Sequence, residues 1–352
     1  MSPTALQENK PLVAVVAATG SQGTASIQGL CHSGLFRVRA LVRDAGSERT
    51  QAMLKTVQDA KVQPEIVVAH LNQPETLSKA FAGVDAVYAY TTPGDGEDEV
   101  TLGRNIVDAC AANDVKWLIW SSTPDSVEIS KGKYQIDAYD DKVKIEKYIE
   151  SRGIQATYVY FGAFFENILK YHYIHTTPSP TEHGEVDIGI AAPIHAVDKP
   201  SEWTSVDHDL GPIVTALAAA GLGLLPGISA DKVLYRHNVT CTGYLSWQEM
   251  EDTMRKVLGR RVTHKVLTED ELQKIGLDYA VKIFKLADEF DPFQRTAGVP
   301  DPLVADLLKQ TQQFIGNGDV KDAIALDDFE SWARRNLVPY IANAEADLAK
   351  EG

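Results

Sequence analysis

Apolar and polar residues alternate along the first half of the chain in blocks that predict strands and helices in turn. Short apolar runs rich in β-branched residues have the length and composition of buried parallel strands, and they lie at 12–18, 37–43, 65–71, 86–92, 117–123 and 156–162. Helices are predicted between them, the first ending near Gly34 and the others near 47–58, 74–82, 97–113 and 138–152. This strict alternation predicts an α/β fold with a doubly wound parallel sheet, in which ligands bind at the carboxyl ends of the strands.

The pattern becomes irregular in the second half of the chain. Residues 170–202 show no clear period and are predicted to form a loop and lid. The apolar stretch 212–228 is bounded by Pro and interrupted by Gly, which indicates a buried helix and a turn rather than a membrane span. A further strand is predicted at 232–240, and helices at 246–262, 268–288 and 320–348, the first of them with a Ser N-cap.

These patterns divide the chain into two predicted domains. A sheet domain spans 11–165, and a smaller mixed α/β domain spans 166–352. The segments at about 203–225 and 232–242 are expected to return to the sheet domain.

The composition indicates which kinds of partner and which cellular compartment suit this protein. The net charge of −15 argues against nucleic acid, because a phosphate-binding surface needs clustered Lys and Arg. Hydrophobic residues make up 44% of the chain and charged residues 24%, an ordinary balance for a globular protein. The three cysteines are far apart, which argues against disulfides and fits a reducing compartment. With no apolar signal-peptide core and no membrane segment, a cytoplasmic location is expected.

The stretch VVAATGSQG at 15–23 lies between the first predicted strand and the first predicted helix. In a dinucleotide-binding turn the first glycine permits a tight bend, the second lets backbone N–H groups approach the pyrophosphate, and the third lets the helix pack on the strand. Gly20 and Gly23 keep the second and third roles, and the start of the helix favours a phosphate. Ala17 stands where the first glycine is expected, which costs on the order of 1 kcal/mol only if its φ is positive.

Several stretches together resemble the NmrA-like family of atypical short-chain dehydrogenase/reductases. They are AATGSQG at 17–23, VRALVRD at 38–44, VYAYTTP at 87–93, WLIWSSTPD at 117–125 and YVYFGAFFEN at 158–167. The resemblance implies a Rossmann-type nicotinamide-binding domain and a smaller domain that closes over a substrate cleft. Some members are reductases related to isoflavone reductases, whereas the NmrA regulator of fungal nitrogen metabolism binds the nucleotide without known turnover. The family usually has glycine at the position of Ala17.

The end of the second strand normally selects the nucleotide. An acidic residue there accepts the 2′-OH of NAD, whereas an Arg favours the 2′-phosphate of NADP. Arg43 stands where the family has a basic residue, and its planar guanidinium suits a phosphate, so NADP(H) is the expected cofactor. The alternative is an Arg on the solvated surface. Asp44 either accepts a ribose hydroxyl or caps the next helix.

The proton-transfer groups depart from the usual Tyr-x-x-x-Lys and Ser arrangement of short-chain dehydrogenases. Tyr139 and Lys142 are three residues apart rather than four, and Ala138 stands where the Tyr would be. Lys142 matches the Lys kept in the isoflavone-reductase-like branch, for which the resemblance implies proton transfer or ribose binding. Both side chains reach the cleft if the helix has begun by Tyr139, because residues three apart share a face. Otherwise Lys142 is one of several lysines on a charged helix. Ser122 either serves the site or caps the turn before Pro124.

Most other predicted site residues lie at the ends of strands and are assigned through the family resemblance. The predicted catalytic group consists of Lys142, Tyr139 and Ser122. The predicted cofactor-binding residues are Ala18, Thr19, Gly20, Ser21, Gln22, Gly23, Arg43, Thr91, Thr92, Ser121, Lys142, Phe161, Gly162 and Phe164. The predicted substrate contacts are Phe165, Asn167 and Tyr134. The aromatic residues at the end of the sixth strand suit a hydrophobic core equally well.

No metal site is expected. Four histidines, His172, His175, His183 and His195, lie in the irregular segment, but no Cys or patterned acid accompanies them. A polar, aromatic substrate lid is the preferred reading. In DHD at 207–209, Asp209 is expected to cap the following helix.

Together these features predict an NADPH-dependent reductase of a small organic substrate. The aromatic, histidine-bearing segment 164–203 suits a planar or bulky molecule such as a secondary metabolite. Hydride would come from the nicotinamide, and the proton from Lys142, Tyr139 or water. The alternative is a non-catalytic, NADP-binding redox sensor of the NmrA type that acts on a regulatory protein partner.

Overall fold

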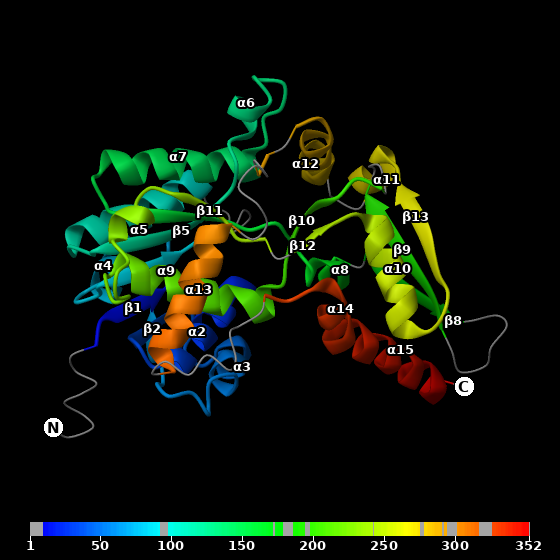
Figure 1. Cartoon of the computed structure of the whole chain (residues 1–352), viewed down its shortest axis with the longest axis horizontal. Coiled ribbons are helices and arrows are strands. Elements are labelled where there is room, and N and C mark those ends of the chain that lie inside the picture. The colour runs from blue at the N-terminus through cyan, green and yellow to red at the C-terminus, as the bar shows by residue number, and fades with distance from the viewer. Residues whose placement is uncertain are drawn as a thin grey trace.

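A seven-stranded parallel sheet organises the larger lobe of the molecule (Figure 1). The computed structural model describes residues 10–91, 98–171, 173–178, 186–193, 198–241, 243–274, 278–290, 292–293, 301–316 and 326–351. The strands follow the order β11-β6-β5-β4-β1-β2-β3, and every neighbouring pair is parallel. Their bounds are Leu12–Val15 (β1), Arg37–Val42 (β2), Glu65–Val68 (β3), Ala86–Ala89 (β4), Trp117–Ser122 (β5), Ala156–Tyr160 (β6) and His237–Val239 (β11). The predicted doubly wound parallel sheet is confirmed.

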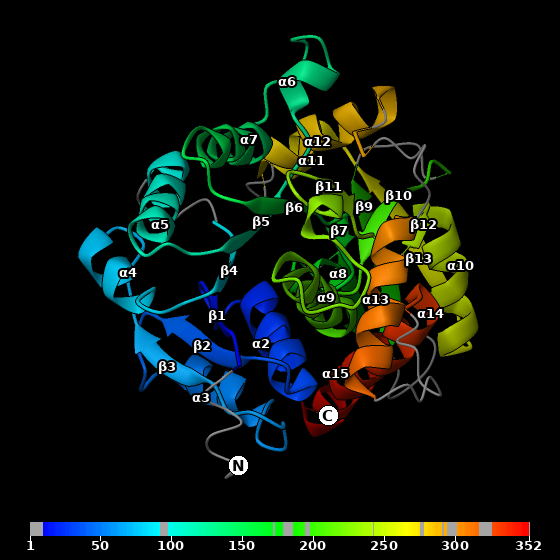
Figure 2. The same cartoon turned by 60° about the vertical axis from the view of Figure 1, so that its left-hand side comes forward.

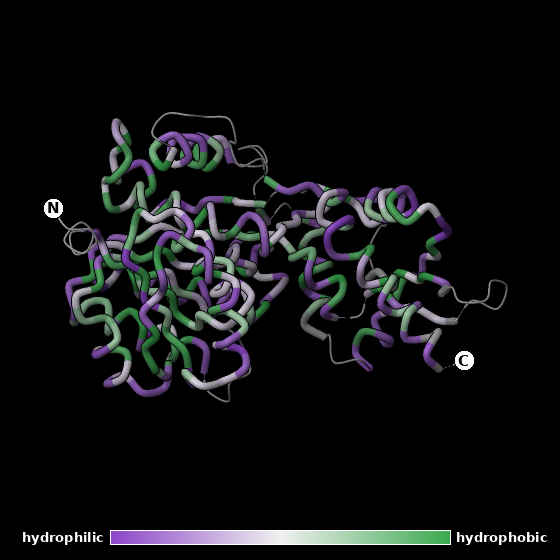
Figure 3. Tube along the Cα trace, turned by 90° about the horizontal axis from the view of Figure 1, so that it is seen from below, coloured by the Kyte–Doolittle hydropathy of each residue, from purple (hydrophilic) through white to green (hydrophobic). Residues whose placement is uncertain are grey.

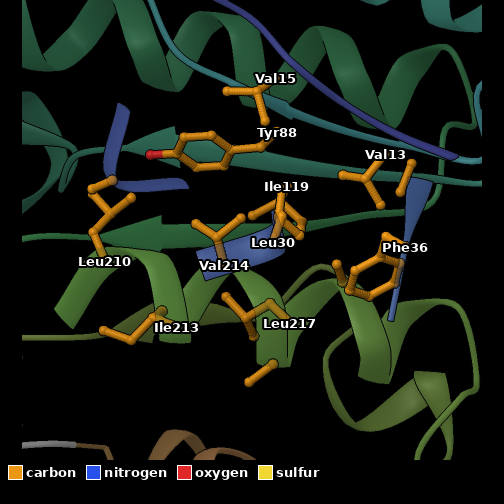
Figure 4. Packing of buried hydrophobic residues seen from close by; sticks show 14 of the residues in the cluster. Val13, Val15, Leu30, Phe36, Tyr88, Ile119, Leu210, Ile213, Val214 and Leu217 are labelled. Carbon is orange, nitrogen blue, oxygen red and sulfur yellow. The ribbon is translucent and has the colours of Figure 1, made fainter. Parts of the chain in front are cut away.

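Helices cover both faces of this sheet, because alternate strand side chains point to opposite faces and both sets are apolar. Val13 and Val15 of β1 point to the face covered by α2 (Ser21–Ser33) and α9 (Gly211–Gly221), as Figure 4 shows. The opposite face is covered by α4 (Pro74–Ala80), α5 (Glu99–Ala112) and α7 (Asp137–Ser151). The helix α3 (Glu48–Lys55) follows β2. Apolar positions are accordingly concentrated inside this lobe (Figure 3).

The smaller lobe contains two three-stranded sheets, and three of their strands begin within 170–202, where a loop and lid were predicted. One has the order β12-β10-β7, formed by Gly243–Leu245, Ser201–Thr204 and Ala163–Phe164. The other has the order β13-β9-β8, formed by Val262–Leu267, Val186–Pro193 and Ile174–Pro178. The prediction of an irregular 170–202 was wrong for two reasons. β8 carries one deeply buried apolar side chain, Ile174, among His, Thr and Pro, so it lacks the usual apolar pattern of a strand. β9 does show the alternation of a strand, with Ile188 and Ile190 buried, and this short pattern was overlooked.

The remaining helices partly match their predictions. The helix predicted at 246–262 is α10 (Trp247–Leu258), and Ser246 forms a capping box with Glu249, as the Ser N-cap prediction required. The segment predicted as one helix at 268–288 contains α11 (Glu269–Lys274) and α12 (Asp278–Glu289). The other short or C-terminal helices are α6 (Ser126–Ile129), α8 (Asn167–Lys170), α13 (Pro302–Ile315), α14 (Phe329–Trp332) and α15 (Val338–Glu351). The helix α13 was not predicted.

The chain returns to the larger lobe twice after leaving it. First α9 packs against α2, and β11 then pairs with β6 at the edge of the sheet. Later α13 packs beside α9 (Figure 2). The assignment of one lobe to the cofactor and the other to the substrate stays a prediction. Across the described parts of the chain, no helix combines the length and apolar character needed to cross a membrane.

Candidate cofactor and active site

The turn between β1 and α2 has the geometry of an anion site. Gly20 is the N-cap of α2 in an extended conformation, and its N–H donates to the Ala17 carbonyl at 3.0 Å. No side chain caps this helix, and its first turn contains no acidic residue. The N–H groups and the positive end of the helix dipole are thus left for an anion from outside.

The two retained glycines leave little room for a side chain. A Cβ atom on Gly23 would lie 2.3 Å from the Ala17 carbonyl oxygen and 2.7 Å from the Ala18 Cα, so the third glycine is what lets α2 pack on the strand. A Cβ atom on Gly20 would lie 2.3 Å from the hydroxyl oxygen of Tyr90. Ala17 has a φ of 49°, so the strained alternative left open by the sequence is the one that the chain adopts.

A cavity of about 420 Å³ opens beside this turn, at the carboxyl ends of β1, β2 and β3. Thr19 and Gly20 line one side, and Arg43 and Arg49 line another. Arg43 was predicted, whereas Arg49, in the first turns of α3, was missed. The only signal for Arg49 was a basic residue near the start of the helix that follows the nucleotide-selecting position.

Asp44 does not cap α3. Its Oδ1 accepts from the Gly46 N–H at 2.8 Å, and the N-cap of α3 is Ser47, whose hydroxyl oxygen accepts from Thr50 N–H. The cap alternative was therefore wrong, because a local turn already satisfies this carboxylate.

Lys142 is anchored at the carboxyl end of β4. The helix α7 begins at Asp137, so both Tyr139 and Lys142 lie on it. The Lys142 ammonium donates to the Thr91 carbonyl at 3.0 Å and forms an ion pair with Glu99. The side chains of Lys142 and Glu99 are 13% and 5% exposed, so this lysine does not belong to the solvated face of the helix. Glu99 was missed by the sequence analysis.

Tyr139 is half-buried, and its surroundings keep the phenol protonated at neutral pH. Burial and, second, the charge of Glu202 raise the pKa of Tyr139 well above its usual range. The carbonyl of Tyr139 accepts from the Thr123 hydroxyl at 3.0 Å, which fixes the start of α7 against the end of β5. Tyr139 can therefore donate a hydrogen bond but is a weak acid.

The two serines at the end of β5 differ in their partners. The Ser121 hydroxyl donates to Gln22 Oε1 at 3.0 Å, and the Tyr88 hydroxyl donates to the same atom at 2.7 Å. Ser122 is 4% exposed, and among the described residues its hydroxyl has no hydrogen-bond partner. Because its hydroxyl bonds to no described residue, Ser122 does not cap the turn before Pro124. A buried hydroxyl without a protein partner is unusual, and a ligand could satisfy it.

The residues at the end of β6 serve packing in this structure. Phe165 is fully buried, and its ring stacks on Trp203 at a centroid distance of 5.8 Å, within the core of the smaller lobe. A Cβ atom on Gly162 would lie 2.4 Å from the Glu202 carbonyl, so glycine is needed for the approach of β10. The rings of Phe161 and Phe164 lie 6.3 Å apart, edge to face.

Tyr134 and Asn167 were predicted to contact the substrate. The Tyr134 hydroxyl donates to Glu289 Oε1 at 2.6 Å and thereby connects the segment before α7 to the end of α12. Asn167 begins α8 and is half-buried. No contact of either residue with the catalytic group is recorded among the described residues, and their substrate role stays a prediction.

Some predicted residues fall outside the described residues, namely Thr92, His172, His183 and His195. His175 lies on β8. Within the described ranges, no group of three His, Cys, Asp or Glu side chains could hold a metal ion.

Asp209 lies in a π-helix, Val206–Leu210, and does not cap α9. Its Oδ1 accepts from the Asp327 N–H at 2.9 Å, 118 residues along the chain. The cap prediction was wrong because this carboxylate connects the two lobes.

The comparisons with known sequences identify relatives of this chain. Residues 9–325 match the model of the NmrA-like family. The NmrA-like family domain-containing oxidoreductase malD of Malbranchea aurantiaca is 28% identical over 278 residues, covering 74% of this chain and 76% of the relative. The corresponding oxidoreductase FrzB of Cladobotryum sp is 34% identical over 149 residues, 40% of this chain and 43% of its own. The corresponding oxidoreductase lnaB of Aspergillus flavus is 27% identical over 226 residues, 60% of this chain and 65% of its own. The match thus spans less than two thirds of FrzB and of lnaB.

Solved structures share the fold. NmrA, a negative transcriptional regulator, in complex with NADP has a TM-score of 0.71 and 21% identity, covering 97% of this chain and 99% of that chain. The NADPH-dependent quinone oxidoreductase of Escherichia coli in complex with NADPH has a TM-score of 0.57 and 18% identity, covering 93% and 99%.

Proposed function

This chain belongs to the NmrA-like family, and from that membership we propose that it is an NADP(H)-dependent reductase of a small organic molecule. The observation that carries the proposal is the position of Lys142 at the carboxyl end of β4, the strand next to β1 and its phosphate turn. This is where the strand order changes direction, the usual ligand position in open α/β sheets. The oxidoreductase names of malD, FrzB and lnaB support the same reading.

The residues present fit a dinucleotide. The uncapped start of α2 and the narrow Gly20 and Gly23 positions would hold the pyrophosphate. The cavity beside the turn would hold the adenosine end, with Arg43 and Arg49 near a 2′-phosphate. Two guanidinium groups at this place favour NADP(H) over NAD(H).

When bound, the cofactor would supply the hydride, the protein would supply orientation and charge, and the proton that completes the reduction would come from Lys142 or water. Lys142 would place one N–H toward the ribose or the substrate oxygen and stabilise the negative charge that develops there. The buried hydroxyl of Ser122 would find its hydrogen-bond partner in the substrate oxygen. Tyr139 would donate a hydrogen bond to the substrate from its protonated phenol. Phe164 is half-buried just after the strand next to Ser122 and would suit a planar or bulky substrate, such as a secondary metabolite.

The decisive experiment is steady-state kinetics on Lys142→Ala with a panel of carbonyl, imine and enone compounds. We expect kcat to fall by about 100-fold or more, while NADPH affinity falls much less because the phosphate contacts remain. Lys144→Ala is the matched control, since Lys144 lies on the same helix with a side chain 55% exposed. An unaltered kcat in Lys142→Ala would contradict the catalytic role. If the wild-type protein binds NADPH without consuming it against any compound, the sensor alternative replaces the reductase.

A further inference from the structure

The anchoring of Lys142 depends on a closed ring of hydrogen bonds at the end of β4. The ammonium donates to the Thr91 carbonyl at 3.0 Å and to Glu99 Oε1. The Thr91 hydroxyl donates to the same Glu99 oxygen at 2.6 Å. Thr91 therefore holds both members of the ion pair, one through its backbone and the other through its side chain.

We propose that Glu99 is the positioning residue for Lys142, fixing the ammonium so that its remaining N–H faces the cofactor cleft. This inference rests on the reductase proposed above. Among the described residues, Thr91 and Glu99 are the acceptors recorded for this ammonium, so one of its three N–H groups remains for a ligand. A free lysine side chain loses rotamer entropy when it is fixed in one position. Because the ring of hydrogen bonds already fixes the Lys142 side chain in the folded protein, this entropy is lost on folding and does not add to the barrier of the reaction.

Burial makes the arrangement more than a surface ion pair. Glu99 is 6% exposed as a residue, and a carboxylate so far from water is tolerated only when it is paired and hydrogen-bonded. Glu99 also begins α5, where a negative charge favours the helix dipole. That second role is structural, and the experiment must separate it from positioning.

A double-mutant cycle makes this separation. We expect Glu99→Gln to lower kcat at least tenfold and to change the NADPH dissociation constant by less than about threefold. In the Lys142→Ala background the same substitution should change kcat by less than twofold, because a residue that acts through Lys142 has nothing left to position. Glu99→Asp, which keeps the charge on a shorter side chain, should recover part of the lost activity.

A spectroscopic measurement tests the same inference without any substrate. In protein with ¹⁵N-labelled lysine, an ammonium held by two acceptors should exchange its protons slowly and give a resolved cross-peak, identified by its loss in Lys142→Ala. Glu99→Gln should broaden or remove that peak. Glu251→Gln is the matched control, because Glu251 is also buried and paired with Arg255, on α10 of the other lobe. It should leave both the peak and kcat unchanged.

The outcomes are distinguishable. Equal and additive effects of Glu99→Gln in the two backgrounds, or an unchanged ammonium peak, would overturn the positioning role. If the wild-type protein reduces no compound, the proposed function fails, and the ammonium peak still decides whether Glu99 holds Lys142.

Discussion

Ala17 holds a backbone conformation that is unfavourable for any residue with a Cβ atom. Its φ is 49°, and its exposed side chain gains little packing in return. The left-handed region costs an L-residue roughly 1–2 kcal/mol, and glycine would remove this strain. Glycine also makes the unfolded chain more flexible, which lowers the free energy of unfolding by about 0.4–1 kcal/mol and offsets part of the gain. We expect Ala17→Gly to raise the free energy of unfolding by up to about 1 kcal/mol in urea denaturation. A loss of stability would contradict the strain.

Gly23→Ala, in the same turn, should have the opposite effect to Ala17→Gly and lower the free energy of unfolding. Its new Cβ atom would lie 2.3 Å from the Ala17 carbonyl oxygen, and the contact is with backbone that cannot move away easily. We expect a loss of about 1–3 kcal/mol, the usual cost of overpacking.

Arg43 and Arg49 together determine the expected choice of nucleotide. A charge-assisted bond to a 2′-phosphate contributes roughly 1.5–3 kcal/mol, which corresponds to about ten- to a hundredfold in affinity. We expect Arg43→Ala to weaken NADPH binding by that factor and to leave NADH binding nearly unchanged in calorimetric titrations. Arg49→Ala should act in the same direction. Equal affinity of the wild-type protein for the two cofactors would refute this assignment.

At the scale of elements, the π-helix Val206–Leu210 joins the two lobes through charged side chains. Asp209 is fully buried and accepts from the Asp327 N–H at 2.9 Å, and His208 Nδ1 lies 2.6 Å from Asp209 Oδ1. Asp327 in turn accepts from Ser205 and forms an ion pair with Arg335, which lies between α14 and α15. The start of α9 is thus attached to the smaller lobe by a polar network, whose strength depends on protonation.

The polar network around Asp209, called here the joint between the lobes, leads us to expect that the free energy of unfolding falls as pH rises. Burial raises the pKa of Glu166, which accepts from the Asp207 N–H, to about 8. The hydrogen bond with Asp209 raises the pKa of His208. Both groups hold a proton more tightly in the folded chain, so their stabilisation is complete below their unfolded pKa values and is lost as pH rises through the folded ones. We expect the melting temperature to fall between pH 5.5 and 8.5, each such group contributing at most about 1.4 kcal/mol per pH unit.

Glu166→Gln tests the origin of that slope. The amide does not titrate, so the fall in melting temperature between pH 5.5 and 8.5 should become shallower. The same slope in the variant would assign the pH dependence to other groups.

Most strands and helices could be predicted from the sequence, and those that were missed have identifiable reasons. All seven strands of the large sheet were predicted, six of them because parallel strands buried on both faces have nearly continuous apolar runs. The seventh, β11, lies within the strand predicted at 232–240. The strand β8 was missed because its one deeply buried apolar residue gives no period. The helix α13 did carry a signal, with Asp301 as N-cap before Pro302 and apolar residues at helical spacing. Lys142 was found through the family resemblance, whereas Glu99, 43 residues away, belongs to no local pattern.

At the scale of the whole molecule, the chain passes between the lobes several times. It leaves the large lobe after β6, returns with α9 and β11, leaves with β12, returns with α13 and leaves again before α14 (Figure 1). At a second place, away from the joint, Glu289 of α12 contacts Lys133 and Tyr134 of the large lobe. Separation of the lobes would therefore disturb several segments at once, and we expect the two lobes to unfold together.

Cofactor binding offers a test of that coupling. A ligand at 100 times its dissociation constant stabilises the folded state by about 2.7 kcal/mol. Although the proposed NADPH contacts lie in the large lobe, we expect one calorimetric transition that moves as a whole to higher temperature with NADPH. Arg43→Ala should show a smaller shift at the same NADPH concentration, because each tenfold loss of affinity removes about 1.4 kcal/mol of this stabilisation. Two transitions, of which NADPH moves only one, would show instead that the lobes are thermodynamically independent and that the joint at Asp209 does not couple them.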